Sequence, residues 1–453
     1  MTKNQILTLP ITDINPDGNG VGRGKDGEVI FVPLTAPGDI ASVKIIKCAK
    51  NYFVGRLEEV LSPSPLRTES DCPVYHRCGG CVYRHLTKEA ELQIKKQTVE
   101  NAMKRIGHLD VPVADTVSFD FSHYRNKVVY PLGRNKDGDT AFGYYARHTH
   151  AIVEHETCPL QEDLFSQIAM FHVKQSEKHH VPVWNEQTGK GVLRHIAMRK
   201  NRKGEYYVCF TASKAFAKAK SMAEELMEAF PQVIGVALNI NPKGDNVIFG
   251  EETLHLAGET VLRDTLRGKT FEISPTAFYQ VNPECTEALY QKAAELADLP
   301  DNGVLLDLYC GAGTIGLSMI KDNQKLCGVE IVPEAIENAK INAKLNGRRE
   351  EDTLFVCGDA SLGVDACKKA FGDPDVIVVD PPRKGLSDKV IETLLEIAPK
   401  RIVYISCNPA TLAANCEKLS YTYEIGEVTP FNMFPRTGHV ESVVCLTKKQ
   451  NQQ

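Results

Sequence analysis

The sequence predicts an α/β protein with a small N-terminal β-barrel, a central mixed α+β region and a C-terminal doubly wound sheet. The sheet is predicted because apolar strand segments alternate with helical segments from about residue 271 onward. The barrel is predicted because short β-branched runs alternate with Gly-rich turns, as in DGNGVGRGKDGEVIFVP. Doubly wound sheets bind ligands outside the carboxyl ends of their strands. We therefore expect functional residues at the strand ends of the C-terminal region.

The domain organisation follows from length and local composition. A chain of 453 residues exceeds the ~100–200 residues of a usual domain, so two or three domains are expected. Residues 1–60 form the predicted barrel, which ends at the Pro-rich hinge LSPSPLR, and residues 67–270 form the central domain, with a helix over residues 88–106. Residues 271–453 form the doubly wound domain, with strands at VLLDLYC, LCGVE, TLFVCGD, DVIVVDPP, RIVYISCNP and HVESVVCL.

Composition excludes several classes of protein. No apolar run approaches the ~20 residues that span a bilayer, and the N-terminus lacks the order of regions typical of a secretory signal. We expect a cytoplasmic protein with no membrane contact, no evident obligate protein partner, and reduced cysteines. The net charge of −5 gives no global attraction for nucleic acid. Any such binding must come from local basic stretches, of which residues 44–56 and 194–220 are the clearest.

The first predicted strand of the C-terminal domain runs directly into a glycine loop, DLYCGAGTIGL. Gly311 and Gly313 lie where the backbone must turn tightly and let a ligand approach before a helix begins. Glu330 ends the next strand, where a carboxylate can accept hydrogen bonds from both hydroxyls of a ribose. Asp359 ends the strand after that. Gly316 completes the G-x-G-x-x-G spacing of dinucleotide-binding proteins, so these residues alone leave NAD open as the ligand.

The fourth predicted strand ends in DPPRKG, and this turn decides against NAD. A rigid Asp-Pro-Pro turn beside a cofactor loop resembles the catalytic loop of methyltransferases that act on nucleobases. Asp380 would then direct a polar group at the edge of a base. The structural alternative for Asp380 is an ordinary turn residue before two prolines.

Cys407 ends the fifth predicted strand, in YISCNPAT. A cysteine in a strand is most often a buried apolar residue. Cys407 differs because polar Ser406 and Asn408 flank it at the sheet edge where the cofactor loop lies, which favours a reactive thiol. Glu441, on the last strand, is the candidate proton acceptor, because apolar neighbours would raise its basicity. Its alternative is an exposed glutamate on an edge strand.

With these motifs in place, the chain resembles the family of RNA uracil-C5 methyltransferases, and most of all its 23S rRNA members. The signature runs from DPPRKG to IVYISCNPAT with sixteen residues between them, and the resemblance extends over nearly the whole chain. A second motif appears as FNMFPRTGHVE, in which Asn432 stands where the family usually has Asp and Arg436 where it has Gln, His or Tyr. These two departures put local substrate contacts in doubt, while the chemistry is retained.

The resemblance implies a covalent mechanism with S-adenosylmethionine as cofactor. In the family, Cys407 would be the nucleophile that adds to C6 of uridine, and Glu441 would remove the C5 proton after methyl transfer. Phe278, in FYQVN, would stack against the RNA, and Asp380 would contact the target base. The positions that would bind the cofactor are Gln280, Tyr309, Gly311, Gly313, Glu330, Asp359 and Asp380.

A cysteine cluster in the central region suggests a metal centre. Cys72, Cys78 and Cys81 are spaced C-x5-C-x2-C, and Cys158 in HETCPL is the fourth candidate ligand. The spacing leaves structural zinc open, although zinc sites usually consist of paired short spacings, and it does not match the C-x3-C-x2-C of radical enzymes. The resemblance to the rRNA subgroup implies that these four cysteines hold a [4Fe–4S] cluster.

The predicted barrel resembles a TRAM domain, an OB-like RNA-binding module. Residues 44–56 would then contact phosphates while the target base is flipped out. The tRNA-specific relatives generally lack both barrel and cluster, so 23S rRNA is the expected partner and tRNA the alternative. Two further alternatives are an amino-group methyltransferase that uses the DPPR loop without a thiol, and an RNA-binding assembly factor without catalytic activity.

Overall fold

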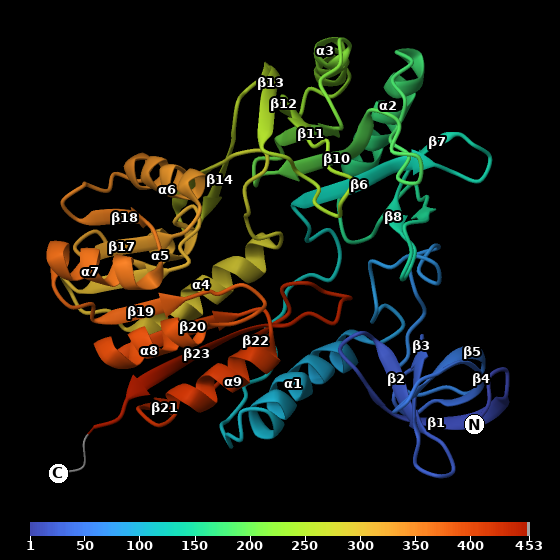
Figure 1. Cartoon of the computed structure of the whole chain (residues 1–453), viewed down its shortest axis with the longest axis horizontal. Coiled ribbons are helices and arrows are strands. Elements are labelled where there is room, and N and C mark those ends of the chain that lie inside the picture. The colour runs from blue at the N-terminus through green and yellow to red at the C-terminus, as the bar shows by residue number, and fades with distance from the viewer. Residues whose placement is uncertain (451–453) are drawn as a thin grey trace.

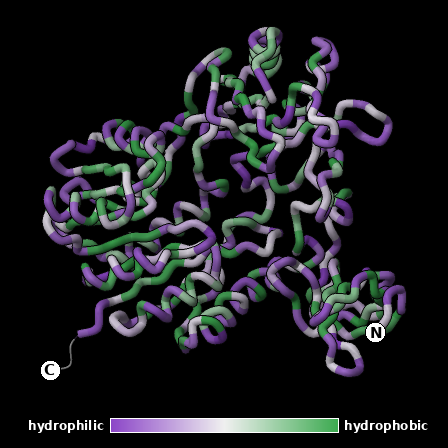
Figure 2. The backbone as a smooth tube through the Cα atoms, viewed as in Figure 1, coloured by the Kyte–Doolittle hydropathy of each residue, from purple (hydrophilic) through white to green (hydrophobic). Residues whose placement is uncertain are grey.

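The structure is a computed structural model that describes residues 1–450. Figure 1 shows three parts: the barrel at the lower right, a central sheet above it, and the C-terminal sheet on the left. In Figure 2, the green apolar stretches follow the strands of the C-terminal sheet, whereas much of the periphery is purple. Within residues 1–450, no helix has the length and apolar character required to cross a membrane.

The N-terminal part is the closed barrel that the sequence predicts, with strand order β1-β2-β3-β5-β4. Alternate residues of its strands point inward, and Leu9, Ile30 and Val43 are fully or almost fully buried. Arg67 in the hinge region donates two hydrogen bonds, of 2.8 and 2.7 Å, to the buried Asp39 carboxylate, which fixes the exit of the chain from the barrel. The strands are β1 (Ile6–Ile14), β2 (Asn19–Arg23), β3 (Val29–Pro33), β4 (Ile40–Cys48) and β5 (Phe53–Ser62).

The central part is built on a six-stranded sheet with order β13-β12-β11-β10-β6-β7. Two helices, α2 (Asp163–Lys178) and α3 (Ala219–Ala229), contribute to the core on one face of this sheet. The strands are β6 (Lys127–Arg134), β7 (Thr140–Phe142), β10 (Leu193–Lys200), β11 (Tyr206–Ala212), β12 (Val233–Ile240) and β13 (Glu252–Gly258). Two short pairs accompany it: β8 (Tyr144–Tyr145) with β9 (Ile152–Val153), and β14 (Leu262–Leu266) with β15 (Lys269–Ile273).

The C-terminal part is the predicted doubly wound sheet, with order β18-β17-β16-β19-β20-β23-β21. The first five of these strands are parallel, and β23 is antiparallel to both neighbours. The strands are β16 (Val304–Leu308), β17 (Lys325–Glu330), β18 (Thr353–Cys357), β19 (Val376–Val379), β20 (Arg401–Ser406), β21 (Tyr423–Ile425), β22 (Thr429–Phe431), which pairs with β23, and β23 (Glu441–Lys448).

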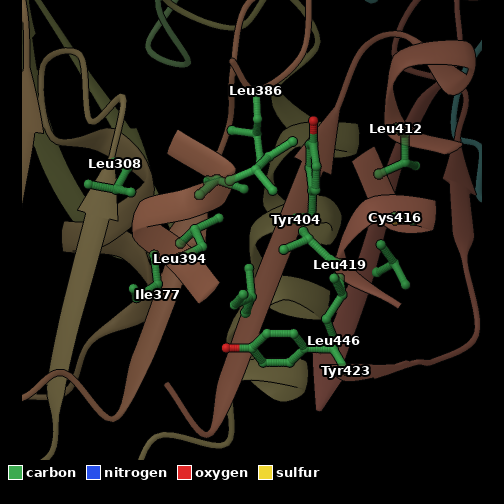
Figure 3. Close-up of a cluster of buried hydrophobic side chains, with 14 of the residues drawn as sticks. Leu308, Ile377, Leu386, Leu394, Tyr404, Leu412, Cys416, Leu419, Tyr423 and Leu446 are labelled. Carbon is green, nitrogen blue, oxygen red and sulfur yellow. The ribbon is translucent and has the colours of Figure 1, made fainter. Parts of the chain in front are cut away.

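Helices cover both faces of this sheet, as a doubly wound fold requires. The helices α4 (Pro283–Ala297), α5 (Thr314–Met319) and α6 (Pro333–Leu345) share one core, and α7 (Ala360–Phe371), α8 (Asp388–Ile397) and α9 (Pro409–Leu419) share the other. Figure 3 shows part of the second core, where Leu394 of α8 and Leu412 of α9 lie over Ile377 and Tyr404 of the sheet.

The predicted helix of the central region is α1 (Lys88–Arg105), which starts at the Thr87 cap. Its buried residues Val99, Ala102 and Met103 belong to the core of the C-terminal sheet. The helix thus packs on α9, although its sequence position lies inside the proposed central domain. The proposed boundary between residues 270 and 271 falls within β15 and stays a prediction.

Candidate active site

The glycine loop between β16 and α5 turns as the sequence predicts. Tyr309, Gly311 and Gly313 have φ values of 71°, 53° and 78°, and positive φ is natural for the glycines and unusual for the tyrosine. The backbone N–H of Tyr309 donates to the Val329 carbonyl oxygen at 2.9 Å, which holds the loop against β17. A Cβ on Gly311 would meet no atom within 4 Å, so the outer side of the loop is open to a ligand.

Asp307 supports this loop from below, and the sequence reasoning did not identify it. Its Oδ2 accepts a hydrogen bond from the Gly316 N–H at 2.9 Å, while its Oδ1 is buried without a hydrogen-bond partner. Burial raises the pKa of Asp307 to about 8, so at neutral pH the group is mostly the neutral acid. Gly316 therefore lets the start of α5 pack closely onto Asp307. This packing explains why a glycine stands at the third position of the G-x-G-x-x-G spacing.

Glu330 is held rigidly at the end of β17. Its Oε1 accepts hydrogen bonds from the N–H groups of Ile331 and Val332 at 2.8 and 3.0 Å, and its Oε2 accepts from Gly311 at 3.3 Å. The next residue, Ile331, is 73% exposed, which is unusual for a large apolar side chain. A fixed carboxylate beside an uncovered apolar side chain fits the ribose and the base of a nucleoside cofactor.

Asp359, at the far end of the same sheet edge, already has protein partners. It caps α7 by accepting a hydrogen bond from the Leu362 N–H at 3.0 Å, and it forms an ion pair with Lys389 at 2.6 Å. The hydrogen bond from Lys389 lowers the pKa of Asp359.

Gln280 and Phe278, in the segment before α4, differ in exposure. Gln280 is buried, and its backbone carbonyl accepts a hydrogen bond from Asn126 at 3.0 Å, whereas Phe278 is 79% exposed. The structure thus leaves the Phe278 ring free for a stacking partner.

Cys407 and Glu441 come together because β23 runs antiparallel to β20. Ser406 pairs with Ser442 in that register, so the residue after β20 lies beside the first residue of β23. Glu441 is 4% exposed and its strand lies inside the sheet, between β20 and β21, which rules out the exposed edge-strand alternative. Asp380 follows the neighbouring strand β19. Three strand ends therefore bring a thiol and two carboxyl groups to one site.

The pKa values at this site reflect burial and mutual repulsion. Burial, followed by the negative charges of Glu441 and Asp380, raises the pKa of Cys407 to about 11. Burial, followed by the charge of Asp380, raises the pKa of Glu441 to about 8, and burial raises that of Asp380 to about 7. The positive charge of Arg383 opposes the shifts of Cys407 and Glu441. The resting thiol is consequently protonated at neutral pH.

Arg383 and His439 are functional candidates that the sequence reasoning missed. Arg383 Nη2 lies 3.4 Å from His439 Nε2, and the Arg383 backbone carbonyl accepts from Asn408 Nδ2 at 3.0 Å. Asn408 also caps α9, so the loops after β19 and β20 are bonded together. The signal for Arg383 was present in the sequence, because it directly follows the Asp-Pro-Pro turn.

The two departures from the family motif point into the protein and not toward a substrate. Asn432 is fully buried and its Oδ1 accepts a hydrogen bond from Lys95 of α1. Arg436 is 9% exposed, donates to the Leu86 carbonyl at 2.9 Å and lies 3.4 Å from Glu91, which also pairs with Lys95 at 3.1 Å. These residues anchor the loop before Glu441 on α1, so the doubt about substrate contacts was misplaced.

The four predicted cluster cysteines, Cys72, Cys78, Cys81 and Cys158, all line one cavity of about 130 Å³. Arg84 and Arg125 also line it, and Arg84 Nε is buried without a hydrogen-bond partner. Among residues 1–450, no group of His, Cys, Asp or Glu side chains converges closely enough to hold a single metal ion.

A larger groove of about 790 Å³ leads to Cys407. Its walls come from the barrel, from α1, and from the loops that carry Cys407 and His439. In the basic stretch of residues 194–220, Arg194 and Arg199 are buried and donate to backbone carbonyls, Arg199 to those of Tyr279 and Ala277. The basic side chains that are exposed there are Arg202, Lys203, Lys214, Lys218 and Lys220. The fold and the site therefore indicate an α/β methyltransferase with a small closed β-barrel at its N-terminus.

Comparison with known proteins gives the family. The family model described as tRNA (Uracil-5-)-methyltransferase matches residues 87–352 and 368–449, and the TRAM domain matches residues 2–57. The chain belongs to this family, so it is an S-adenosylmethionine-dependent RNA (uracil-5-)-methyltransferase with an N-terminal TRAM barrel. The family resemblance and the barrel assignment made from the sequence are both confirmed, and the amino-group methyltransferase alternative is set aside.

Relatives extend over the full length of the chain. A protein of Bacillus cereus named "Uncharacterized RNA methyltransferase" is 41% identical over 451 residues, covering 98% of this chain and 97% of its own. A similarly named protein of Oceanobacillus iheyensis is 40% identical and covers 99% of this chain and 98% of its own. The crystal structure of Pyrococcus abyssi tRNA (uracil-54, C5)-methyltransferase with S-adenosyl-L-homocysteine has a TM-score of 0.76, at 27% identity, over 97% of this chain and 100% of that chain.

The Pyrococcus abyssi structure bears on whether the substrate is rRNA or tRNA. The sequence-based preference for rRNA assumed that tRNA enzymes lack the additional parts of the chain. A tRNA enzyme that aligns over 97% of this chain removes that assumption as a general rule. The length and architecture of the chain therefore do not distinguish rRNA from tRNA.

Proposed function

We propose that this enzyme methylates C5 of one or two uridines in 23S rRNA through a covalent adduct between Cys407 and C6. The observation that carries the mechanism is the pairing of β20 with β23, which sets Cys407 beside the buried Glu441. Carbon 5 of uridine is too weakly nucleophilic to accept a methyl group unaided. A thiol on one side and a basic carboxylate nearby are the two protein groups that this reaction requires.

In the proposed reaction, the Cys407 sulfur adds to C6 and its proton leaves to solvent. The electron pair of the C5–C6 double bond moves to C5 and O4, giving an enolate whose C5 is nucleophilic. S-adenosylmethionine, when bound, would supply the electrophilic methyl group that C5 takes up, its sulfur–methyl bond breaking to leave S-adenosylhomocysteine. Because its pKa is about 8, Glu441 must first release its own proton to solvent. As a carboxylate it then accepts the C5 proton, the C5–C6 double bond forms again, and the sulfur leaves as a thiolate. The positive charge of Arg383 favours the Cys407 thiolate and the Glu441 carboxylate, because it opposes the rise in the pKa values of both groups.

The cofactor site proposed on this basis is the open side of the glycine loop. The Glu330 carboxylate would accept hydrogen bonds from the ribose hydroxyls of S-adenosylmethionine, and Ile331 would cover one face of its adenine base. The positive-φ turn of the glycine loop would leave room for the amino-acid part of the cofactor. Asp380 would lie between cofactor and target uracil, and Phe278 would stack on the RNA. The full proposed set of cofactor ligands is Gln280, Tyr309, Gly311, Gly313, Glu330, Asp359 and Asp380.

The decisive experiment replaces the proposed nucleophile. Cys407→Ala, incubated with RNA and S-adenosylmethionine, should give no 5-methyluridine and no RNA adduct that survives denaturing electrophoresis. Cys445→Ala is a matched control, because Cys445 is a buried cysteine of β23 on the same sheet. Undiminished product from Cys407→Ala would overturn the covalent mechanism. Retained RNA binding without affinity for S-adenosylmethionine in the wild type would favour the assembly-factor alternative.

We further propose that the four cluster cysteines hold a [4Fe–4S] cluster. The support is the cavity they line together with Arg84 and Arg125, whose positive charges and free Nε–H suit an anionic sulfide cluster. Such a cluster would cross-link residues 72–81 to Cys158 and needs no redox role. Protein purified without oxygen should be brown, with iron and sulfide in equal amounts, whereas stoichiometric zinc without iron would contradict the proposal.

The choice of 23S rRNA rests on the resemblance to the rRNA subgroup, and tRNA is the second candidate because of the Pyrococcus abyssi enzyme. Both are tested by mapping 5-methyluridine in 23S rRNA and in tRNA from a strain that lacks the gene. Loss of the modified nucleotide from 23S rRNA, restored by the wild-type gene and not by Cys407→Ala, is the expected result. Loss from tRNA alone would establish the second candidate.

A further inference from the structure

The groove that ends at Cys407 has one wall that no step of the proposed reaction uses. This wall is α1, which runs from the barrel toward α9 (Figure 1). Its opposite face is fixed, because Val99, Ala102 and Met103 are buried in the core of the C-terminal sheet. The side chains along the groove are therefore presented by a rigid helix that cannot move independently of the active site.

Four polar side chains of α1 line the groove at intervals of one helical turn. Gln93, Gln97, Asn101 and Arg105 are each four residues apart, and all four are exposed. Their side-chain polar groups form no hydrogen bond or ion pair with another residue of the described part of the chain. A row of three unpaired carboxamides that ends in a guanidinium is thus directed into an open channel.

The charge of the groove favours a polyanion. Arg105 lies at one end of the row and Arg383 beside Cys407, and Asp13 is the one acidic residue among the described residues that line the channel. The whole chain has a net charge of −5, so this surface differs from the average of the molecule. The groove is also continuous with Cys407, where the target uridine must lie. The occupant is therefore the RNA that carries that uridine.

The spacing of the row specifies the form of the RNA. Four residues of α-helix advance by about 6 Å, whereas stacked nucleotides advance by only ~3.4 Å along each strand. One carboxamide for each nucleotide therefore matches an unstacked, extended strand and not a duplex. Carboxamides carry both a donor and an acceptor, so they can bond the edge of a splayed base in two places.

We propose that α1 is the sequence-reading element of the enzyme. The carboxamides of Gln93, Gln97 and Asn101 hydrogen-bond to the edges of unpaired bases adjoining the target uridine, and Arg105 contacts a backbone phosphate. This inference rests on the proposed function, because it requires an RNA uridine at Cys407. It makes α1 a specificity determinant, separate from the residues that perform the reaction.

The test uses the full-length protein and a panel of short RNA hairpins that each present one uridine in a loop, with one flanking loop nucleotide changed at a time. The measurement is kcat/KM for methylation of each hairpin. In the triple variant Gln93→Ala, Gln97→Ala, Asn101→Ala, discrimination between the best and the altered hairpins should fall roughly tenfold or more. Alanine is favoured in helices, so the melting temperature should not fall; Gln97→Ala alone serves if the triple variant does not fold.

Arg105→Ala should behave differently from the carboxamide variants. It should weaken binding to every hairpin alike and reduce the slope of log affinity against log salt by about one. Glu100→Ala and Lys104→Ala are matched controls, since both residues are exposed on α1 and neither lines the groove. Both should leave the discrimination unchanged.

Wild-type discrimination in the triple variant, or an equal loss of activity on every hairpin, would overturn the inference. An equal loss with an unchanged fold would mean that the side chains bind RNA without reading it. Failure of the proposed function is distinguishable, because the wild-type enzyme would then form no 5-methyluridine in any RNA. A wild type that methylates uridine, with variants that still discriminate, contradicts the role of α1 alone.

Discussion

Replacing Glu441 with glutamine should stabilise the protein while it stops turnover. The Glu441 pKa is raised from 4.5 to about 8 by burial and by Asp380. Below pH 4.5 the carboxyl group is protonated in both the folded and the unfolded chain, so the two proteins should be equally stable. Between pH 4.5 and 8 only the unfolded chain releases the proton, and the wild type loses roughly 1.4 kcal/mol of unfolding free energy per pH unit.

The difference in unfolding free energy between Glu441→Gln and the wild type should therefore have a defined size that depends on pH. Glu441→Gln should be about 3 kcal/mol more stable than the wild type near pH 7, and roughly 5 kcal/mol more stable above pH 8, where the difference levels off. Urea unfolding of both proteins at about pH 5, 7 and 9 measures it. Glu424→Gln is the matched control, because Glu424 is an exposed residue of β21 in the same sheet.

The same variant tests the role of the residue in catalysis. Without a base to take the C5 proton, the methylated adduct cannot release the sulfur, so Glu441→Gln should accumulate a protein–RNA complex that survives denaturing electrophoresis. A stability difference that does not change with pH would refute the burial argument. Normal turnover by Glu441→Gln would refute its role as the base.

Three further outcomes are expected. Glu91→Gln leaves two buried cations without their carboxylate, so urea unfolding should show a loss of about 3–5 kcal/mol; an unchanged midpoint would contradict it. Gly316→Ala places a Cβ 2.9 Å from Asp307 Oδ2, which should cost about 1–3 kcal/mol of stability and weaken S-adenosylmethionine binding in calorimetry, whereas Gly244→Ala, with open space around its Cβ, should not. Serine at the four cluster cysteines should abolish visible absorbance and lower the melting temperature; retained colour would place the iron elsewhere.

The C-terminal fold was predictable because buried parallel strands are short, continuous apolar runs. All six strands predicted there exist, from β16 to β23. The strands β21 and β22 were missed because three residues are too few to show a period. The position of α1 was also not predictable, because its buried stripe shows that the helix packs on something and does not show that the partner is α9.

Candidate residues at strand ends were predictable for a similar reason, since parallel strands bring their carboxyl ends to one edge. Cys407, Asp380 and Glu330 were found in this way. Asp307 was missed because it lies within an apolar strand and not after it. Arg194 and Arg199 were misread as surface charge, because a strand sequence does not reveal that a long cation is buried against loop carbonyls.

One antiparallel strand explains how a doubly wound sheet can carry out a reaction that needs two flanking groups. Parallel strands contribute only the residues that follow their carboxyl ends, as β19 and β20 contribute Asp380 and Cys407. The second flanking group must come from a strand that begins at that edge, and β23 is such a strand, starting at the proposed base Glu441. The loop before it is anchored through Arg436 to Glu91 of α1 and to the segment that follows Cys81.

This connectivity gives the two proposed catalytic groups, Cys407 and Glu441, different dependence on the rest of the molecule. Cys407 is fixed by the sheet and by the cap of α9, which both belong to the C-terminal fold. Glu441 depends in addition on the loop that Arg436 anchors, because the N–H groups of Val82 and Tyr83 donate to the Arg436 carbonyl at 2.8 and 3.1 Å. Disturbing α1 or the cysteine-lined cavity should consequently impair proton removal more than the addition of sulfur to C6, and the covalent adduct should persist while product formation slows.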